Sequence, residues 1–189
     1  MKLDYIYIIN LNTPEHQIEQ KIKDVNWPYA INYYILPATN GWEAVKDQSK
    51  SRFKFKIADW WKIDNGKDFY TRGVTPGEAG CMLSHYECIY NAYEAGFENV
   101  LIFEEDFYTL GKFPTQEELN AVPNDASLIY LDRSQQCPDW DEERINDHVT
   151  RVGYTYNNHA YIMTRKGMKE VIDSTILDNV IVSDEFFPA

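Results

Sequence analysis

Apolar, β-branched and aromatic residues gather in short runs along the chain, and segments with helical spacing separate these runs. The runs have the length and composition of strands in a covered sheet. They occupy residues 4–10, 29–36, 99–103, 127–131 and 159–163. Strands that alternate with helices predict an α/β domain with a mostly parallel central sheet. In such sheets ligands bind at the carboxyl ends of the strands, so functional residues are sought there.

The clearest helix is predicted to begin at Thr75. Thr75 and Glu78 have the spacing of a capping box, with Pro76 at the first helical position, and Gly96 is suited to end the helix. His85 lies beside the apolar stripe of this helix, two turns from Glu78 on the same face. We expect this polar edge to face a ligand cleft. The alternative is a histidine that only makes local hydrogen bonds.

Other helix signals are shorter. Thr13 offers a capping hydroxyl before Pro14, and Thr164 offers one before a segment of helical spacing. Residues 41–73 carry several lysines beside aromatic residues, and we expect a surface excursion that contains a helix. The acidic run 139–143 is interpreted as a solvated loop.

Three acids, Glu104, Glu105 and Asp106, follow the apolar run 99–103 directly. Acids at the end of a buried strand are costly unless a positive group meets them. Alternation along an extended chain would place Glu104 and Asp106 on the same side. Two such carboxylates suit Mg²⁺ or Mn²⁺ held together with a diphosphate. The alternative is an acidic loop in an acidic protein.

A second pair of acids, Asp184 and Glu185, lies between apolar pairs near the end of the sequence. Acids held between hydrophobic anchors often belong to a site, although they also occur in surface turns. Asp132 follows another predicted strand and is a weaker candidate for the same reason.

The overall charge limits the possible partners. The formal net charge is −12 and the estimated pI is near 4.7, which disfavours nucleic acid and anionic membranes. An anionic nucleotide would need a divalent cation or placed basic residues. The chain has 189 residues, a size that fits one domain.

The cysteines and the apolar runs bear on localisation. There are three cysteines, and Cys81 and Cys88 lie seven residues apart on the predicted helix, too far for a disulfide. No apolar run approaches the length of a membrane span, and residues 1–10 lack the layout of a signal peptide. We therefore expect a soluble, cytoplasmic protein.

Taken in order, several segments resemble glycosyltransferase family 25, which includes bacterial lipooligosaccharide galactosyltransferases and collagen hydroxylysine galactosyltransferases. The resemblance covers nearly the whole chain, with Glu105 standing where the family usually has Asp. The matching segments are Ile9-Asn10-Leu11, Ala38-Thr39-Asn40-Gly41, Gly77-Glu78-Ala79-Gly80-Cys81-Met82-Leu83-Ser84-His85, the acid triplet, and Asp184-Glu185-Phe186-Phe187-Pro188.

The resemblance implies a single glycosyltransferase domain of the GT-A fold over residues 1–189, C-terminally truncated relative to the family. It implies a UDP-sugar donor, Mn²⁺ or Mg²⁺, and transfer of galactose or glucose to a saccharide or hydroxylated protein acceptor. It also implies residue roles. Glu104 and Asp106 would bind the metal, and Asp184 would be the catalytic base, with Glu185 next. The donor would be bound by Asn10, Glu78, Ser84, His85 and Glu104.

Two other functions are compatible with the sequence. A nucleotidyltransferase could present acids to a metal–diphosphate complex, but no Gly-rich phosphate loop with a following Lys comes after the first strand. A catalytically silent protein could keep the fold and bind a nucleotide sugar without transferring it.

Overall fold

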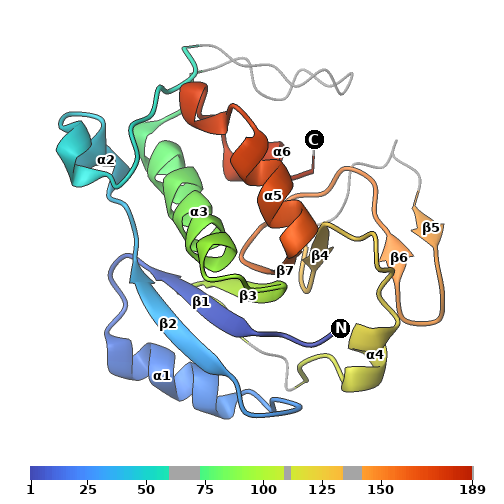
Figure 1. Ribbon diagram of the computed structural model, residues 1–189. Coiled ribbons are helices and arrows are strands. Elements are labelled where there is room, and N and C mark those ends of the chain that lie inside the picture. Colours follow the sequence, from blue (N-terminus) through green and yellow to red (C-terminus); the bar gives the residue numbers. More distant parts are fainter. Residues whose placement is uncertain (60–72, 109–111, 134–141, 189) are drawn as a thin grey trace.

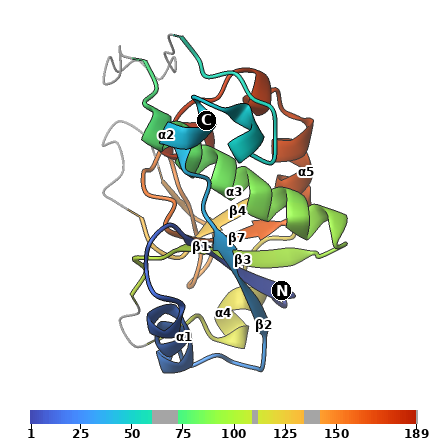
Figure 2. The same ribbon diagram turned by 90° about the vertical axis from the view of Figure 1, so that its left-hand side faces the viewer.

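The structure is a computed structural model that describes residues 1–59, 73–108, 112–133 and 142–188. A central sheet lies between two layers of helices (Figures 1 and 2).

The central sheet has five strands in the order β2-β1-β3-β7-β4. β1 pairs in parallel with β2 and β3, whereas β7 runs antiparallel to both β3 and β4. The predicted α/β class with a mostly parallel central sheet is therefore confirmed. The strand bounds are β1 Tyr5–Asn10, β2 Asn32–Pro37, β3 Asn99–Glu104, β4 Leu128–Tyr130 and β7 Ala160–Thr164.

Helices cover both faces of the sheet. α1 (Glu15–Asp24) and α4 (Gln116–Asn120) lie on one face. α3 (Pro76–Glu94) and α5 (Arg165–Asp173) pack side by side on the other, as Figure 1 shows. The shorter elements are α2 Gly41–Ala44, α6 Ser183–Phe186, the 3-10 helices Gln48–Lys50 and Ile176–Asp178, and the hairpin strands β5 Glu143–Arg144 and β6 Thr150–Arg151.

Strand alternation explains why the chain builds two apolar layers. Ile6 and Ile8 of β1 are buried toward α1, whereas Tyr7 and Ile9 are buried toward α3. Successive side chains in a strand point to opposite faces, so an unbroken apolar run is needed where both faces are covered. The runs in β1 and β3 meet this requirement.

The helix signals are confirmed for α3. Thr75 and Glu78 form a complete capping box, and Gly96 has a positive φ of 78° just after the helix. Thr164 likewise caps α5 through a hydrogen bond to its hydroxyl from the Gly167 amide. The predicted cap of α1 is wrong, because Pro14 is the N-cap residue and no side chain caps this helix.

The segment after α2 returns to the main body through main-chain contacts. Ile57 and Val180 form an isolated parallel bridge, flanked by hydrogen bonds from the Lys56 amide to the Leu177 carbonyl and from the Ala58 amide to the Val180 carbonyl. These contacts hold the chain just before α6. The rest of the predicted excursion, residues 60–72, lies outside the described residues, as do Cys137 and residues 139–141 of the acidic run.

The described helices also bear on membrane insertion and disulfides. None of them is long and apolar enough to cross a membrane. Cys81 and Cys88 are not joined to each other, as their spacing on the helix predicts.

Candidate active site

A cavity of about 270 Å³ lies where β3 ends. Four segments that are far apart in the sequence line it: α3, the end of β3, the loop before β7, and the start of α6. The lining residues are Glu78, Cys81, Glu104, Asn157, Asn158, His159, Val182, Ser183 and Asp184. This is the edge at which ligands bind in α/β sheets.

His85 lies beneath this cavity and supports it. The side chain is fully buried, with Nε2 3.0 Å from Glu104 Oε1 and Nδ1 2.8 Å from the Tyr161 hydroxyl. The expectation that His85 faces the cleft is therefore wrong, because α3 packs it against β3 and β7. Its neighbour on the same face, Glu78, does line the cavity.

The His85–Glu104 pair is an ion pair. Burial lowers the pKa of His85, but the contacts with Cys81 and Glu104 outweigh burial and raise that pKa to about 10. For Glu104, burial raises the pKa, but the contacts with His85 outweigh this and hold it below its usual value. Glu104 is thus a fixed anion at the floor of the cavity.

Cys81 adds a thiol to the same group. Its Sγ lies 3.5 Å from both Glu104 Oε1 and Ser183 Oγ. Within the described ranges, Cys81, His85 and Glu104 form a group whose ligand atoms lie within 4.8 Å of one another, close enough to share a metal ion. Thiol and imidazole ligands suit Zn²⁺ better than Mn²⁺, which prefers oxygen. Of this group, only the Glu104 carboxylate fits a hard cation.

The acid triplet does not continue the strand. β3 ends at Glu104, and the Phe107 amide donates to the Glu104 carbonyl at 3.1 Å, which closes a turn through Glu105 and Asp106. The argument that strand alternation places Glu104 and Asp106 on the same side is therefore wrong. Asp106 is exposed and does not line the cavity. Its role as a metal ligand stays a prediction.

Glu105 holds the loop after β1. Its Oε2 accepts from the backbone amides of Leu11, Asn12 and Thr13 at 3.0, 3.0 and 2.8 Å. Burial raises the pKa of Glu105, but these bonds and one from the Thr13 side chain outweigh it and lower that pKa. The Thr13 hydroxyl therefore serves Glu105 and leaves α1 uncapped.

Two residues expected to bind the donor have their polar groups used inside the fold. The Asn10 side chain donates to the Thr13 carbonyl and accepts from the Thr13 amide, both at 2.9 Å. Ser84 has no exposed surface, and its hydroxyl donates to the Gly80 carbonyl and accepts from the Thr39 amide. Neither residue lines the cavity, and in this structure their side chains hold backbone segments near the site.

The two late acids differ in their surroundings. Asp184 lines the cavity and accepts a hydrogen bond from the Asn158 amide at 3.2 Å. Burial and the nearby Glu104 carboxylate raise the pKa of Asp184. Glu185 is only 2% exposed and accepts a hydrogen bond from the Tyr154 hydroxyl inside the protein. Asp184 is therefore the acid of this pair that can reach a ligand.

Several lining residues were not recognised in the sequence. His159 lines the cavity, and its Nε2 lies 2.9 Å from Oδ2 of Asp132, the weaker candidate at the end of β4. Asn157 and Asn158 come just before it. A run of polar residues directly before a strand was the available signal, because β7 is reversed and its amino end lies at the functional edge of the sheet.

The cavity thus combines acids from three separate segments of the chain at the functional edge of an α/β sheet. In sequence, residues 3–147 match glycosyltransferase family 25 (LPS biosynthesis protein). The chain belongs to glycosyltransferase family 25. The mixed α/β architecture with its mostly parallel central sheet agrees with the GT-A type of fold that membership implies.

Curated family 25 relatives match almost the whole chain. A protein named procollagen lysyl hydroxylase and glycosyltransferase from Acanthamoeba polyphaga mimivirus is 28% identical over 96% of this chain and 21% of its own. Procollagen galactosyltransferase 1-A from Xenopus laevis is 26% identical over 100% of this chain and 31% of its own. A probable inactive glycosyltransferase 25 family member 3 from Bos taurus is 33% identical over 100% of this chain and 32% of its own length.

The chain therefore spans between a fifth and a third of the length of these relatives. It is a glycosyltransferase family 25 domain by sequence, and proteins with this domain include named galactosyltransferases as well as members named inactive.

Proposed function

We propose that this chain transfers a hexose, galactose or glucose, from a UDP-sugar to a hydroxyl group of a saccharide or hydroxylated protein, in a metal-dependent reaction. The observation that carries this proposal is the pair Glu104 and Asp184 in one cavity. One carboxylate is fixed as an anion by buried His85, and the other has a raised pKa. Two such acids could divide the tasks of a transferase, one at the metal ion and one at the acceptor proton.

Asp184 is proposed as the general base. It would accept the proton of the acceptor hydroxyl as that oxygen bonds to the anomeric carbon of the hexose. The bond between this carbon and the diphosphate oxygen would break, and its electron pair would leave with UDP. The raised pKa of Asp184 brings it closer to neutrality, where a base both stays ionised and takes a proton well.

Glu104 is proposed as the acid nearest the diphosphate, with Asp106 as the second metal ligand. A bound Mn²⁺ or Mg²⁺ would neutralise the charge that develops on the leaving diphosphate. The net charge of −12 supports a need for such a cation, because an anionic donor would otherwise meet an acidic protein. The buried His85 would keep the Glu104 carboxylate in place.

A silent nucleotide-sugar-binding protein is the second candidate, supported by relatives that are named inactive. It would keep the fold and the donor site but would not turn over. The presence of both Glu104 and Asp184 in the cavity favours the enzyme.

The test is a screen of UDP-galactose and UDP-glucose with Mn²⁺, measuring slow release of UDP by transfer to water. We expect release with at least one donor, and none after chelation of the metal. In parallel, calorimetric titration of UDP should give tighter binding with Mn²⁺ than without, and Asp106→Asn should weaken the metal-dependent part. UDP binding without any turnover would support the silent protein, and no binding of UDP would overturn both candidates.

A further inference from the structure

Three buried polar atoms have no hydrogen-bond partner within the described ranges: the Tyr130 hydroxyl oxygen and both atoms of the Asn158 side-chain amide. Asn158 is only 2% exposed. Buried polar side chains are almost always hydrogen-bonded, and an exception needs an explanation. An amide with both its donor and its acceptor unused is an unusually complete exception.

Both residues that carry these atoms lie near Asp184. The Asn158 backbone amide donates to Asp184 Oδ1 at 3.2 Å, and Asn158 lines the same cavity as Asp184 and Glu104. Tyr130 is close enough to Asp184 that, after burial, the charge of this acid contributes to raising the tyrosine pKa. Tyr130 also lines a neighbouring hollow of about 960 Å³. The unused polar groups therefore gather where the proposed chemistry takes place.

The backbone before Asn158 is held in an uncommon conformation. Asn157 has a φ of 73°, in the left-handed region that few non-glycine residues adopt. Such conformations cluster at functional sites, where the surroundings hold them. Here the conformation precedes the residue whose amide is unused, and both asparagines line the cavity.

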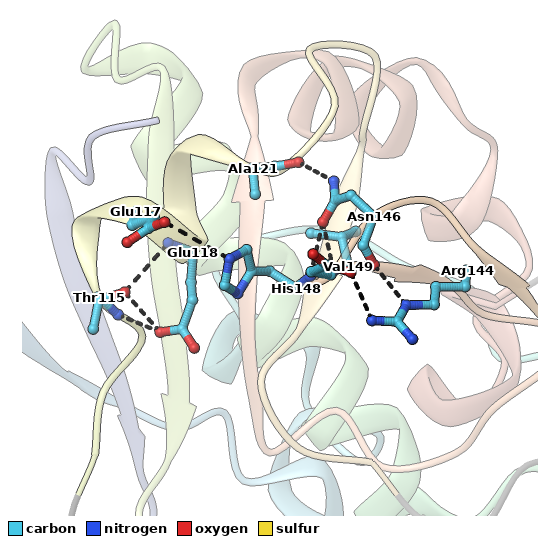
Figure 3. A network of polar contacts seen from close by, with 9 residues as sticks. Thr115, Glu117, Glu118, Ala121, Arg144, Asn146, His148 and Val149 are labelled. Atoms are coloured by element: carbon cyan, nitrogen blue, oxygen red, sulfur yellow. Dashed lines mark hydrogen bonds and ion pairs between the residues drawn. The ribbon is translucent and has the colours of Figure 1, made fainter.

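A second asparagine shows what a structural amide looks like in this protein. The Asn146 amide donates to the Ala121 carbonyl at 2.8 Å and accepts from the His148 and Val149 amides at 2.9 Å, as Figure 3 shows. Its donor and its acceptor are both satisfied within the fold. The contrast indicates that the Asn158 side-chain amide does not stabilise the fold through hydrogen bonds.

We propose that the Asn158 side-chain amide binds hydroxyl groups of the hexose carried by the donor, and that the Tyr130 hydroxyl, near Asp184, binds another hydroxyl of the same sugar. An amide donates from nitrogen and accepts at oxygen, so it can pair with two neighbouring sugar hydroxyls at once. A cavity of about 270 Å³ is at the small end of ligand sites and suits one sugar ring better than a whole nucleotide sugar. This inference rests on the proposed transferase function.

The experiment compares Asn158→Leu and Tyr130→Phe with the parent and with Asn146→Leu. For the first two variants we expect thermal unfolding at or above the parent temperature, because they remove unpaired buried polar atoms. Asn146→Leu should unfold at a lower temperature than the parent.

Turnover of the donor is measured as UDP release from UDP-galactose and UDP-glucose with Mn²⁺. Asn158→Leu should lower kcat/KM by on the order of tenfold or more. UDP itself should bind with an affinity within about twofold of the parent.

Each other outcome is decisive. A loss of stability in Asn158→Leu as large as in Asn146→Leu would assign Asn158 a structural role and overturn the proposal. Unchanged donor hydrolysis in a stable Asn158→Leu protein would also overturn it, even if transfer to an added acceptor fell, because the amide would then serve the acceptor. Failure of the parent to bind UDP with Mn²⁺ would instead overturn the proposed function, so the two failures are distinguishable.

Discussion

Gly41 and Gly80 lie backbone against backbone. A Cβ atom on Gly80 would stand 2.6 Å from the Gly41 backbone nitrogen and 2.6 Å from the Thr39 carbonyl oxygen. A Cβ on Gly41 would meet the Pro76 carbonyl oxygen at 1.7 Å. The Ala-x-x-Gly element and the Gly-Glu-x-Gly block thus form one contact between α2 and α3. This contact sets the depth at which α3 brings Cys81 and His85 to the site.

Gly80→Ala should therefore be strongly destabilising. No flexible side chain can give way, so the two helices must move apart, at a cost of about 1–3 kcal/mol or more. Gly77 is the matched control on the same helix, since a Cβ there would first meet the Trp42 side chain at an ordinary 3.7 Å. Gly77→Ala should be neutral or stabilising by up to about 1 kcal/mol. Chemical denaturation measures both, and equal effects would contradict the close approach.

The sequence predicts the features of this protein that depend on near neighbours. The cap formed by Thr75 and Glu78 needs residues three positions apart, and the burial of β1 and β3 follows from continuous apolar runs. These signals were enough for the architecture and for the edge of the sheet at which the cavity lies.

The features that the sequence could not predict depend on distant partners. Glu105 binds the amide of Leu11, 94 positions away, and the Tyr161 hydroxyl meets His85 across 76 positions. Periodicity indicated that His85 lies beside the apolar stripe, but not that β7 would cover it. After the turn that follows Glu104, Phe107 is buried against residues that are distant in the sequence.

His85→Ala should lower both stability and metal-dependent donor binding. The substitution leaves the Tyr161 hydroxyl unpaired in the core and removes the ion pair of Glu104, at a cost of about 1–3 kcal/mol. Glu104 then loses its fixed position, so UDP should bind more weakly with Mn²⁺, while binding without metal should change little. Denaturation and calorimetry measure the two effects.

His148 is the control for that variant. It is partly exposed, and its Nε2 lies 4.0 Å from the exposed Glu117 carboxylate, a contact drawn in Figure 3. His148→Ala should change stability by less than about 0.5 kcal/mol. A His85→Ala protein as stable as His148→Ala would show that the buried imidazole contributes nothing to the fold.

Glu105 should make stability depend on pH. Its folded pKa is lowered, so its contribution is fully present above the unfolded pKa of about 4.3 and is lost as the pH falls through the folded pKa. Glu105→Gln should cost about 1–3 kcal/mol near neutral pH, because a carboxylate that accepts three amides becomes a neutral amide. The difference from the parent should shrink in acid, as measured by denaturation across the pH range.

Glu118→Gln provides the comparison for Glu105. Glu118 also accepts from a backbone amide, that of Thr115, and the hydrogen bonds from Thr115 lower its pKa. Gln can take the place of Glu in a capping box, and the site is exposed, so this variant should change stability little at any pH. A stability difference between Glu105→Gln and the parent that stays constant in acid would contradict the role of the Glu105 charge.

Asp184→Asn should remove most of the transfer activity and leave donor binding nearly intact. Asp184 lies in the cavity and its carboxylate accepts a hydrogen bond from the Asn158 backbone amide, whereas Glu185 beside it is enclosed by the fold. A general base is worth roughly a hundred- to ten-thousand-fold in rate. The rate of UDP release in the presence of Mn²⁺ should fall by a factor of that size, and calorimetry should give a UDP affinity within a small factor of the parent.

The same role for Asp184 predicts a pH dependence. The base must be ionised, and its pKa is raised, so the parent's kcat/KM should decline in acid at a pH above the range of an ordinary aspartate. Glu185→Gln should retain this decline and most of the rate. Loss of UDP binding in Asp184→Asn would move the residue to the donor side, and full activity would remove it from catalysis.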